Sequence, residues 1–100
     1  MGSNTQYFAE ALTDAIKLHV HAKYPKVNIN HWSHHDYVTD EFEFATIDIA
    51  VPSSSLGKHQ YCNIHINENE TIYRNAKYEY NDPDMISKIL QAVMNWIENG

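Results

Sequence analysis

The middle of the chain, residues 26–80, alternates apolar and polar side chains in runs that short polar turns separate. Alternation with a period of two is typical of β-strands that bury only one face. The runs are KVNINHW (26–32), EFEFATIDIAV (41–51), HQYCNIHI (59–66) and TIYRNAKYEY (71–80). Because consecutive strands joined by short turns tend to pair with each other, we expect an antiparallel meander of four strands.

The segments between the runs are rich in turn-forming residues. We expect a loop at SHHDYVTD (33–40), a turn at PSSSLG (52–57) and a hairpin turn at NENE (67–70). Within the second run the apolar side chains change parity, which predicts a β-bulge near Ala45–Thr46. One parity contains Phe42 and Phe44, and the other contains Ile47, Ile49 and Val51.

Amphipathic helices are predicted on both sides of the strands. Apolar residues recur at helical spacing in residues 4–23, where they include Phe8, Leu12, Ile16 and Val20. A stronger stripe follows NDPD (81–84), in which Asn81 or Asp82 caps the helix and Pro83 occupies its first position. This stripe contains Met85, Ile86, Ile89, Leu90, Val93, Trp96 and Ile97.

Both helices are needed to cover the apolar face of the sheet. The chain is therefore predicted to be an α+β protein, a two-layer sandwich with the order α-β-β-β-β-α. Residues 1–100 form a single domain, in which residues 1–3 resemble an expression scar. The one cysteine, Cys62, requires no oxidising compartment, and no apolar run is long enough to cross a membrane, so a cytoplasmic location is expected.

The formal charge of -6 excludes several classes of partner. Nucleic acids and anionic membranes are disfavoured because both attract basic surfaces. No Lys or Arg lies between Lys26 and Lys58. This window contains Asp36, Asp40, Glu41, Glu43 and Asp48, together with the aromatic residues Trp32 and Tyr37. Glu41, Glu43 and Asp48 are expected to share the solvent face of the second strand.

Aromatic residues beside clustered carboxylates are typical of a protein-binding patch, because aromatic anchors provide binding energy and charges steer association. A purely solvated acidic face is the alternative. A Mg²⁺ or Ca²⁺ site is also open, although the spacing of a calcium loop is missing.

The segment HWSHHD (31–36) contains the candidate metal ligands His31, His34 and His35. If the segment is extended, His31 and His35 are about 13 Å apart, too far for one metal ion. Only a loop that folds back brings them together, and a polar loop without a metal is the simpler interpretation. Another interpretation is a pH response: the chain has 7 histidines, and their protonation near pH 6 would change the surface charge. Catalysis by His and Asp is a further possibility, but the sequence contains no nucleophile motif to accompany these residues.

The sequence therefore predicts a small acidic, non-enzymatic protein-binding module, such as an inhibitor or an immunity-type protein that acts on a basic partner surface. No cofactor is expected. One alternative is a His/carboxylate metal-binding protein or metal-dependent hydrolase. Another is a homodimeric accessory subunit, with Tyr73, Tyr78 and Tyr80 as aromatic residues near the last strand.

Overall fold

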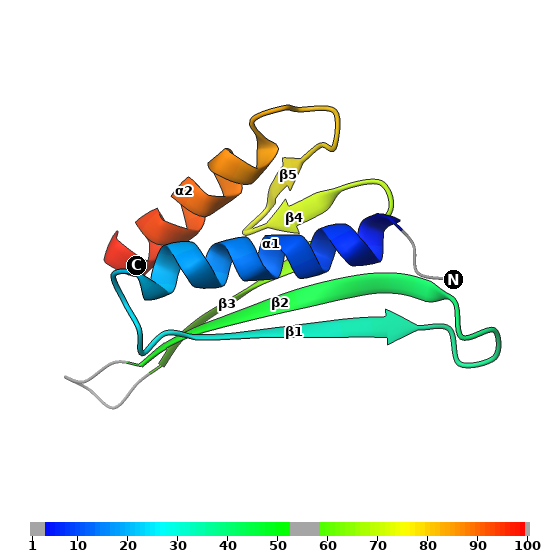
Figure 1. Cartoon of the computed structure of the whole chain (residues 1–100), viewed down its shortest axis with the longest axis horizontal. Helices are drawn as coiled ribbons and strands as arrows, with labels where there is room; N and C mark the ends of the chain where they lie inside the picture. The colour runs from blue at the N-terminus through cyan, green and yellow to red at the C-terminus, as the bar shows by residue number, and fades with distance from the viewer. Residues whose placement is uncertain (1–3, 53–58, 100) are drawn as a thin grey trace.

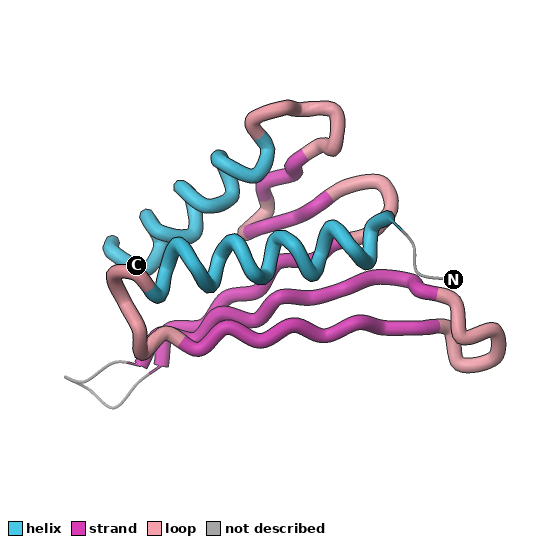
Figure 2. Tube along the Cα trace, viewed as in Figure 1, coloured by secondary structure: helices cyan, strands magenta, loops and turns pink. Residues whose placement is uncertain are grey.

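A computed structural model describes residues 4–52 and 59–99 of the protein. The helices α1 (Asn4–His21) and α2 (Met85–Asn99) lie on one side of an antiparallel sheet, as Figures 1 and 2 show. The sheet has the order β1-β2-β3-β4-β5. Its strands are β1 (Asn28–His35), β2 (Phe42–Pro52), β3 (His59–Ile66), β4 (Thr71–Tyr73) and β5 (Ala76–Tyr78). The predicted α+β sandwich is confirmed.

The number of strands differs from the prediction. The run at residues 71–80 is a hairpin of two short strands rather than one strand, because Arg74 and Asn75 turn the chain back on itself. Their φ angles are 49° and 71°. Positive φ at both central residues defines the tight turns that match the twist of a hairpin, and Asn tolerates this conformation much better than Arg.

The first strand is longer than predicted. It begins at Asn28 and continues to His35, so the prediction of a loop from Ser33 onward was wrong. Pairing with β2 explains the extension, since the partners run from Asn28↔Ala50 to His35↔Phe42. The connecting loop comprises only residues 36–41.

A bulge is present in β2, but it is not at Ala45–Thr46. His34 pairs with Phe44 and His35 pairs with Phe42, which leaves Glu43 as the extra residue. Because the bulge lies at Glu43, it moves only the first residue of β2, Phe42, to the other face of the sheet. Phe42 packs against the core, whereas Phe44 stacks on His34 outside it. The expectation that both phenylalanines share a face is therefore corrected.

The core fills the space between the sheet and the helices. At its centre, four isoleucines of β2 and β3 are fully buried, namely Ile47, Ile49, Ile64 and Ile66. Leu12 and Ile16 of α1 and Ile89 and Val93 of α2 pack in the same cluster. Among the described residues, no buried side-chain nitrogen or oxygen lacks a hydrogen-bond partner.

Polar contacts fix both ends of α2. The Asp82 carboxylate orders the turn before α2, because it accepts a hydrogen bond from the Asp84 amide at 2.9 Å. Since α2 begins at Met85, Pro83 precedes the helix, and the prediction that it occupies the first helical position was wrong. The Lys88 ammonium lies 2.5 Å from the same carboxylate and lowers the pKa of Asp82. At the other end, Glu98 accepts hydrogen bonds from Lys23 (2.6 Å) and Tyr24 (2.8 Å) in the connection between α1 and β1.

Two predictions concern residues that the structure does not describe. Apart from Pro52, the turn at residues 52–57 lies outside the described residues, and so do residues 1–3.

Replacing Arg74 with Asn should stabilise the protein. A non-glycine side chain such as Arg in the left-handed region costs about 1–2 kcal/mol, and Asn lowers this cost. We expect Arg74→Asn to raise the free energy of unfolding by about 0.5–1 kcal/mol in urea denaturation. Arg74→Ala is the control, because it removes the charge but keeps the backbone penalty. Equal stability of the two variants would contradict this explanation.

Candidate functional site

The loop between β1 and β2, residues 36–41, forms a compact structure that we call the hairpin tip. Its backbone is closed by hydrogen bonds from the Asp36 amide to the Glu41 carbonyl (2.7 Å) and from the Asp40 amide to the Asp36 carbonyl (2.9 Å). The Asp36 carboxylate accepts hydrogen bonds from the amides of Val38 and Thr39, both at 2.8 Å. The side chain of Asp36 therefore determines the shape of the tip.

The charge of Asp36 is favoured by this arrangement. The amide of Thr39 and then the amide of Val38 are the main causes that lower the pKa of its carboxyl group. His35 adds a contact from the strand side, because its Nδ1 lies 3.3 Å from the Asp40 carbonyl. Asp40 itself has a φ of 59°, a conformation that Asp tolerates better than most residues.

The hairpin tip presents two apolar side chains to solvent. Tyr37 is 100% exposed and Val38 is 87% exposed. Asp40, Glu41 and Glu43 surround them with exposed carboxylates, and within the described residues none of these forms a salt bridge. The tip thus combines an exposed aromatic side chain with negative charge on an ordered loop.

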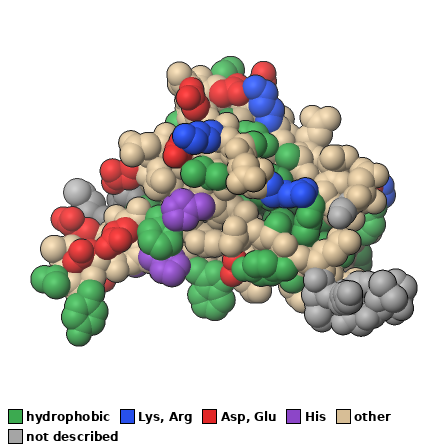
Figure 3. Space-filling view, turned by 180° about the vertical axis from the view of Figure 1, so that it is seen from behind, with side chains coloured by type: hydrophobic (Ala, Val, Ile, Leu, Met, Phe, Trp, Pro, Cys, Tyr) green, Lys and Arg blue, Asp and Glu red, His purple; other side chains and the backbone are tan. Residues whose placement is uncertain are grey.

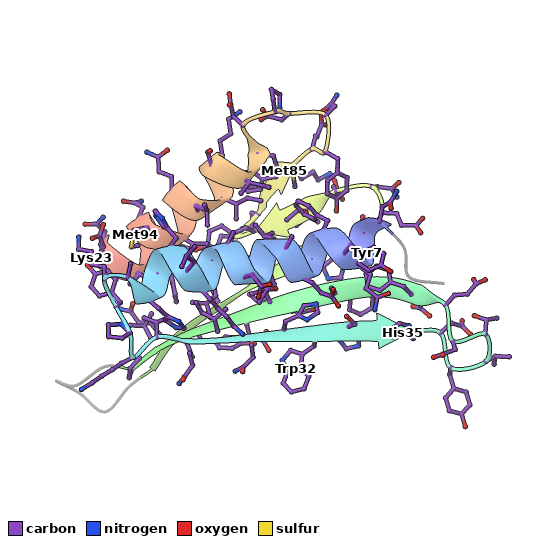
Figure 4. All side chains as sticks on the ribbon, in the orientation of Figure 1. Tyr7, Lys23, Trp32, His35, Met85 and Met94 are labelled. Carbon is purple, nitrogen blue, oxygen red and sulfur yellow. The ribbon has the colours of Figure 1, made fainter. Side chains whose placement is uncertain are left out.

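A second polar and aromatic surface covers the side of the sheet that faces away from the helices, which we call the outer face. On β1 it contains Trp32, which is 55% exposed and points away from α1 in Figure 4. On β3 it contains Tyr61, which is 59% exposed and donates a hydrogen bond to Asp48 at 2.8 Å. This hydrogen bond is the main cause that raises the pKa of Tyr61.

Rings stack across the outer face. Phe44 lies between His34 and His65, with ring centroids separated by 4.3 Å and 4.8 Å respectively. The view from behind shows imidazoles beside hydrophobic side chains, with carboxylates gathered toward the hairpin end (Figure 3). The phenyl ring between them prevents these two histidines from acting as a ligand pair.

The three candidate metal ligands are divided between the two faces of β1. His34 belongs to the outer face, whereas His31 and His35 alternate to the side of the helices, where they pair with Ile47 and Phe42. His31 is within 3.5 Å of the Ser33 hydroxyl, and His35 contacts Phe42 edge to face. Throughout residues 4–52 and 59–99, no group of three or more His, Cys, Asp or Glu side chains is arranged to hold a metal ion.

The structure also separates the predicted acidic residues. Asp36 is used internally by the hairpin tip, and Asp48 lies on the outer face with Tyr61. Asp40, Glu41 and Glu43 are exposed in or beside the hairpin tip, although the side chain of Glu43 also interacts with that of Asp36. Trp32 belongs to the outer face rather than to the tip.

Sequence reasoning missed two residues of these surfaces. Val38 lies directly beside Tyr37, and its position in a polar loop was the available signal. Tyr61 alternates with the inward-facing Cys62, so the parity of β3 already indicated an outward tyrosine.

Comparisons of the chain with protein-family models, with curated proteins and with solved structures found no match. Neither described helix is long and apolar enough to cross a lipid bilayer. The functional inference therefore depends on the chemistry of the surfaces themselves.

Asp36 should control the order of the hairpin tip. Asp36→Ala removes both hydrogen bonds to the amides of Val38 and Thr39, and we expect exchange of these two amides with solvent to accelerate several-fold. Asp36→Asn keeps one acceptor oxygen and should have a smaller effect. Hydrogen exchange measured by NMR tests this, and unchanged exchange in Asp36→Ala would contradict the role of the side chain.

The same hydrogen bonds should depend on pH. Because folding lowers the pKa of Asp36, its contribution is fully present above the unfolded pKa and is lost as the pH falls through the folded pKa. In NMR spectra of the intact protein, the Val38 and Thr39 amide signals should move together over this acidic range. In the Asp36→Asn variant this transition should be absent.

Proposed function

We propose that this protein is a non-enzymatic protein-binding module that inserts its hairpin tip into a partner with a basic surface. The observation that carries the proposal is the complete exposure of Tyr37 on a loop that Asp36 holds in shape. Exposed tyrosines are frequent anchors of protein interfaces because they bury a large area at little entropic cost.

The shape of the tip supports binding in a second way. A loop that is ordered before association loses less conformational entropy when it binds. The hydrogen bonds of Asp36 provide this order without a partner. Tyr37 and Val38 would then enter an apolar pocket from a backbone that is already ordered.

Charge supports a basic partner. The carboxylates of Asp40, Glu41 and Glu43 add to a chain whose formal charge is -6. Such a surface accelerates encounter with a positively charged one and disfavours acidic partners. A module of this kind acts as an inhibitor or an immunity-type protein when the surface it covers is the active region of the partner.

Capture from an extract of the native source tests the proposal. The baits are the wild-type protein, Tyr37→Ala and the charge reversal Glu41→Lys/Glu43→Lys. Glu10→Lys/Asp14→Lys is the matched control, because these carboxylates are exposed on α1. A stoichiometric partner should bind to the wild type and the control but not to the two tip variants.

Binding measurements on the purified protein and its captured partner should separate the contribution of Tyr37 from that of the carboxylates. Tyr37→Ala should weaken binding about thirtyfold, which corresponds to the loss of about 2 kcal/mol at a hot spot. The charge reversal should mainly slow association, and less so at high salt. Equal binding of all variants, or no specific partner, would refute the proposal.

A homodimeric subunit is the second candidate, and the observation that favours it is the free edge of β1. The eight residues Asn28–His35 form the edge of the sheet without any Lys, Asp, Glu or Pro. Such residues usually protect edges from pairing with another strand. Self-pairing of β1 would therefore extend the sheet across two copies.

A charge on this edge should prevent the dimer. We expect Asn30→Lys, an exposed position of β1, to shift a concentration-dependent dimer to monomer in light scattering. Asn81→Lys, exposed in the connection before α2, is the control. A wild-type protein that stays monomeric at all concentrations would exclude this candidate.

A further inference from the structure

One edge of β3 is paired with a neighbouring strand along only part of its length. β2 pairs with all of β3, from His59 to Ile66. On the opposite side, β4 pairs only with the last three residues, Ile64–Ile66. The chain then turns away at Arg74, so within the described residues Gln60–Asn63 have no strand beside them on this side.

Backbone groups are directed toward this free edge. The Asn67 amide donates a hydrogen bond to the Glu70 carbonyl, across the turn that leads into β4. Backbone N–H and C=O groups of an antiparallel strand point to alternate sides, residue by residue. Because the pairing of β3 with β4 shows no shift in register, Tyr61 and Asn63 direct their backbone groups to the same side as Asn67. The register places Asn63 opposite Arg74, so the N–H of Asn63 and both backbone groups of Tyr61 are the ones that β4 leaves without a strand partner.

A groove accompanies the free edge. It has a volume of about 370 Å³ and is lined by Tyr61, Cys62, Asn63, Arg74 and Trp96. Trp96 of α2 is only 6% exposed and forms an apolar wall of the groove. Burial raises the pKa of the Cys62 thiol, so this side chain acts as a small apolar neighbour rather than as a nucleophile.

Arg74 provides the charge of the groove. It is the only arginine of the chain and is exposed at the turn where β4 ends. The described residues offer it no salt bridge, whereas Lys23, Lys77 and Lys88 each have a carboxylate partner. A guanidinium group binds carboxylates well because its donors match their two oxygens.

We propose that the free edge of β3 binds an extended peptide segment of a partner protein, which adds as an antiparallel strand and places an acidic side chain against Arg74. Strand addition would satisfy both backbone groups of Tyr61 and the N–H of Asn63. Alternate side chains of the segment would face Trp96, which favours apolar residues at those positions. The acidic residue follows from charge complementarity with Arg74, which interacts with the neutral side chain of Tyr73 but has no salt bridge among the described residues.

This site is separate from the hairpin tip and does not depend on the function proposed for it. The tip is acidic and offers side chains, whereas the β3 edge offers backbone groups and a cation. Either proposal can therefore fail while the other holds.

Selection from a library of random heptapeptides displayed on phage tests the inference, with the folded full-length protein as target. Enriched sequences should contain Asp or Glu beside alternating apolar residues. Synthetic versions of them, acetylated and amidated at their ends, should shift the NMR signals of the Tyr61 and Asn63 amides. Replacing the Glu or Asp of the peptide with Gln or Asn should lower its affinity for the protein.

Arg74→Asn is the decisive variant, because Asn suits the positive φ of this turn and the fold should be retained. It should lower the affinity of the selected peptides at least tenfold, as expected for a charge-assisted hydrogen bond. Lys26→Asn, which removes another cation that has no salt bridge within the described residues, should leave the affinity unchanged.

Several results would overturn the inference. These are the absence of enriched peptides, enrichment of sequences without acidic residues, signal shifts confined to other strands, or equal affinity for Arg74→Asn and the wild type. The protein could also form a dimer that Arg74→Asn abolishes. That result would overturn the proposal of a peptide, because the occupant of the β3 edge would then be a second copy of the chain.

Discussion

The packing of two helices against one face of the sheet is the constraint on which the other surfaces depend. The isoleucines at its centre are fully buried, and each contributes about 1.5–3 kcal/mol relative to an exposed side chain. With both helices on the same face, nothing among the described residues covers the other, and the order β1-β2-β3-β4-β5 leaves β1 at one edge. The outer face, the free edges and the hairpin tip are consequences of this one-sided arrangement.

The parts of the fold that the sequence predicted are those in which burial and secondary structure agree. The stripe of α2 and the alternation of β3 were sufficient, because most of their apolar residues face the core, with Ile86 as the exposed exception in the stripe. The end of β1 could not be predicted, since His31, Ser33 and His35 occupy the inward positions and remove the apolar alternation. Pairing with β2, which is a tertiary interaction, extends this strand.

The bulge illustrates how far a parity argument can reach. The parity change showed that an extra residue was needed, but any position between Phe42 and Ile47 satisfies the alternation. Its location at Glu43 decides that Phe44 lies on the outer face between two histidines. The hairpin of β4 and β5 was missed for a related reason, because Arg at its turn is a weak turn signal.

The acidic window was recognised from the sequence, but its carboxylates turned out to have different uses. The carboxylate of Asp36 accepts hydrogen bonds within the tip, and that of Asp48 accepts one from Tyr61. Fewer carboxylates are therefore without an internal hydrogen bond than the composition suggested. Arg74, a single residue outside this window, gave no pattern that sequence reasoning could detect. The role proposed for it depends on the early end of β4, which leaves Arg74 beside the free edge of β3. At physiological salt, charges more than about 8 Å apart are largely screened from each other, so a net acidic protein can still attract a carboxylate locally at such a cation.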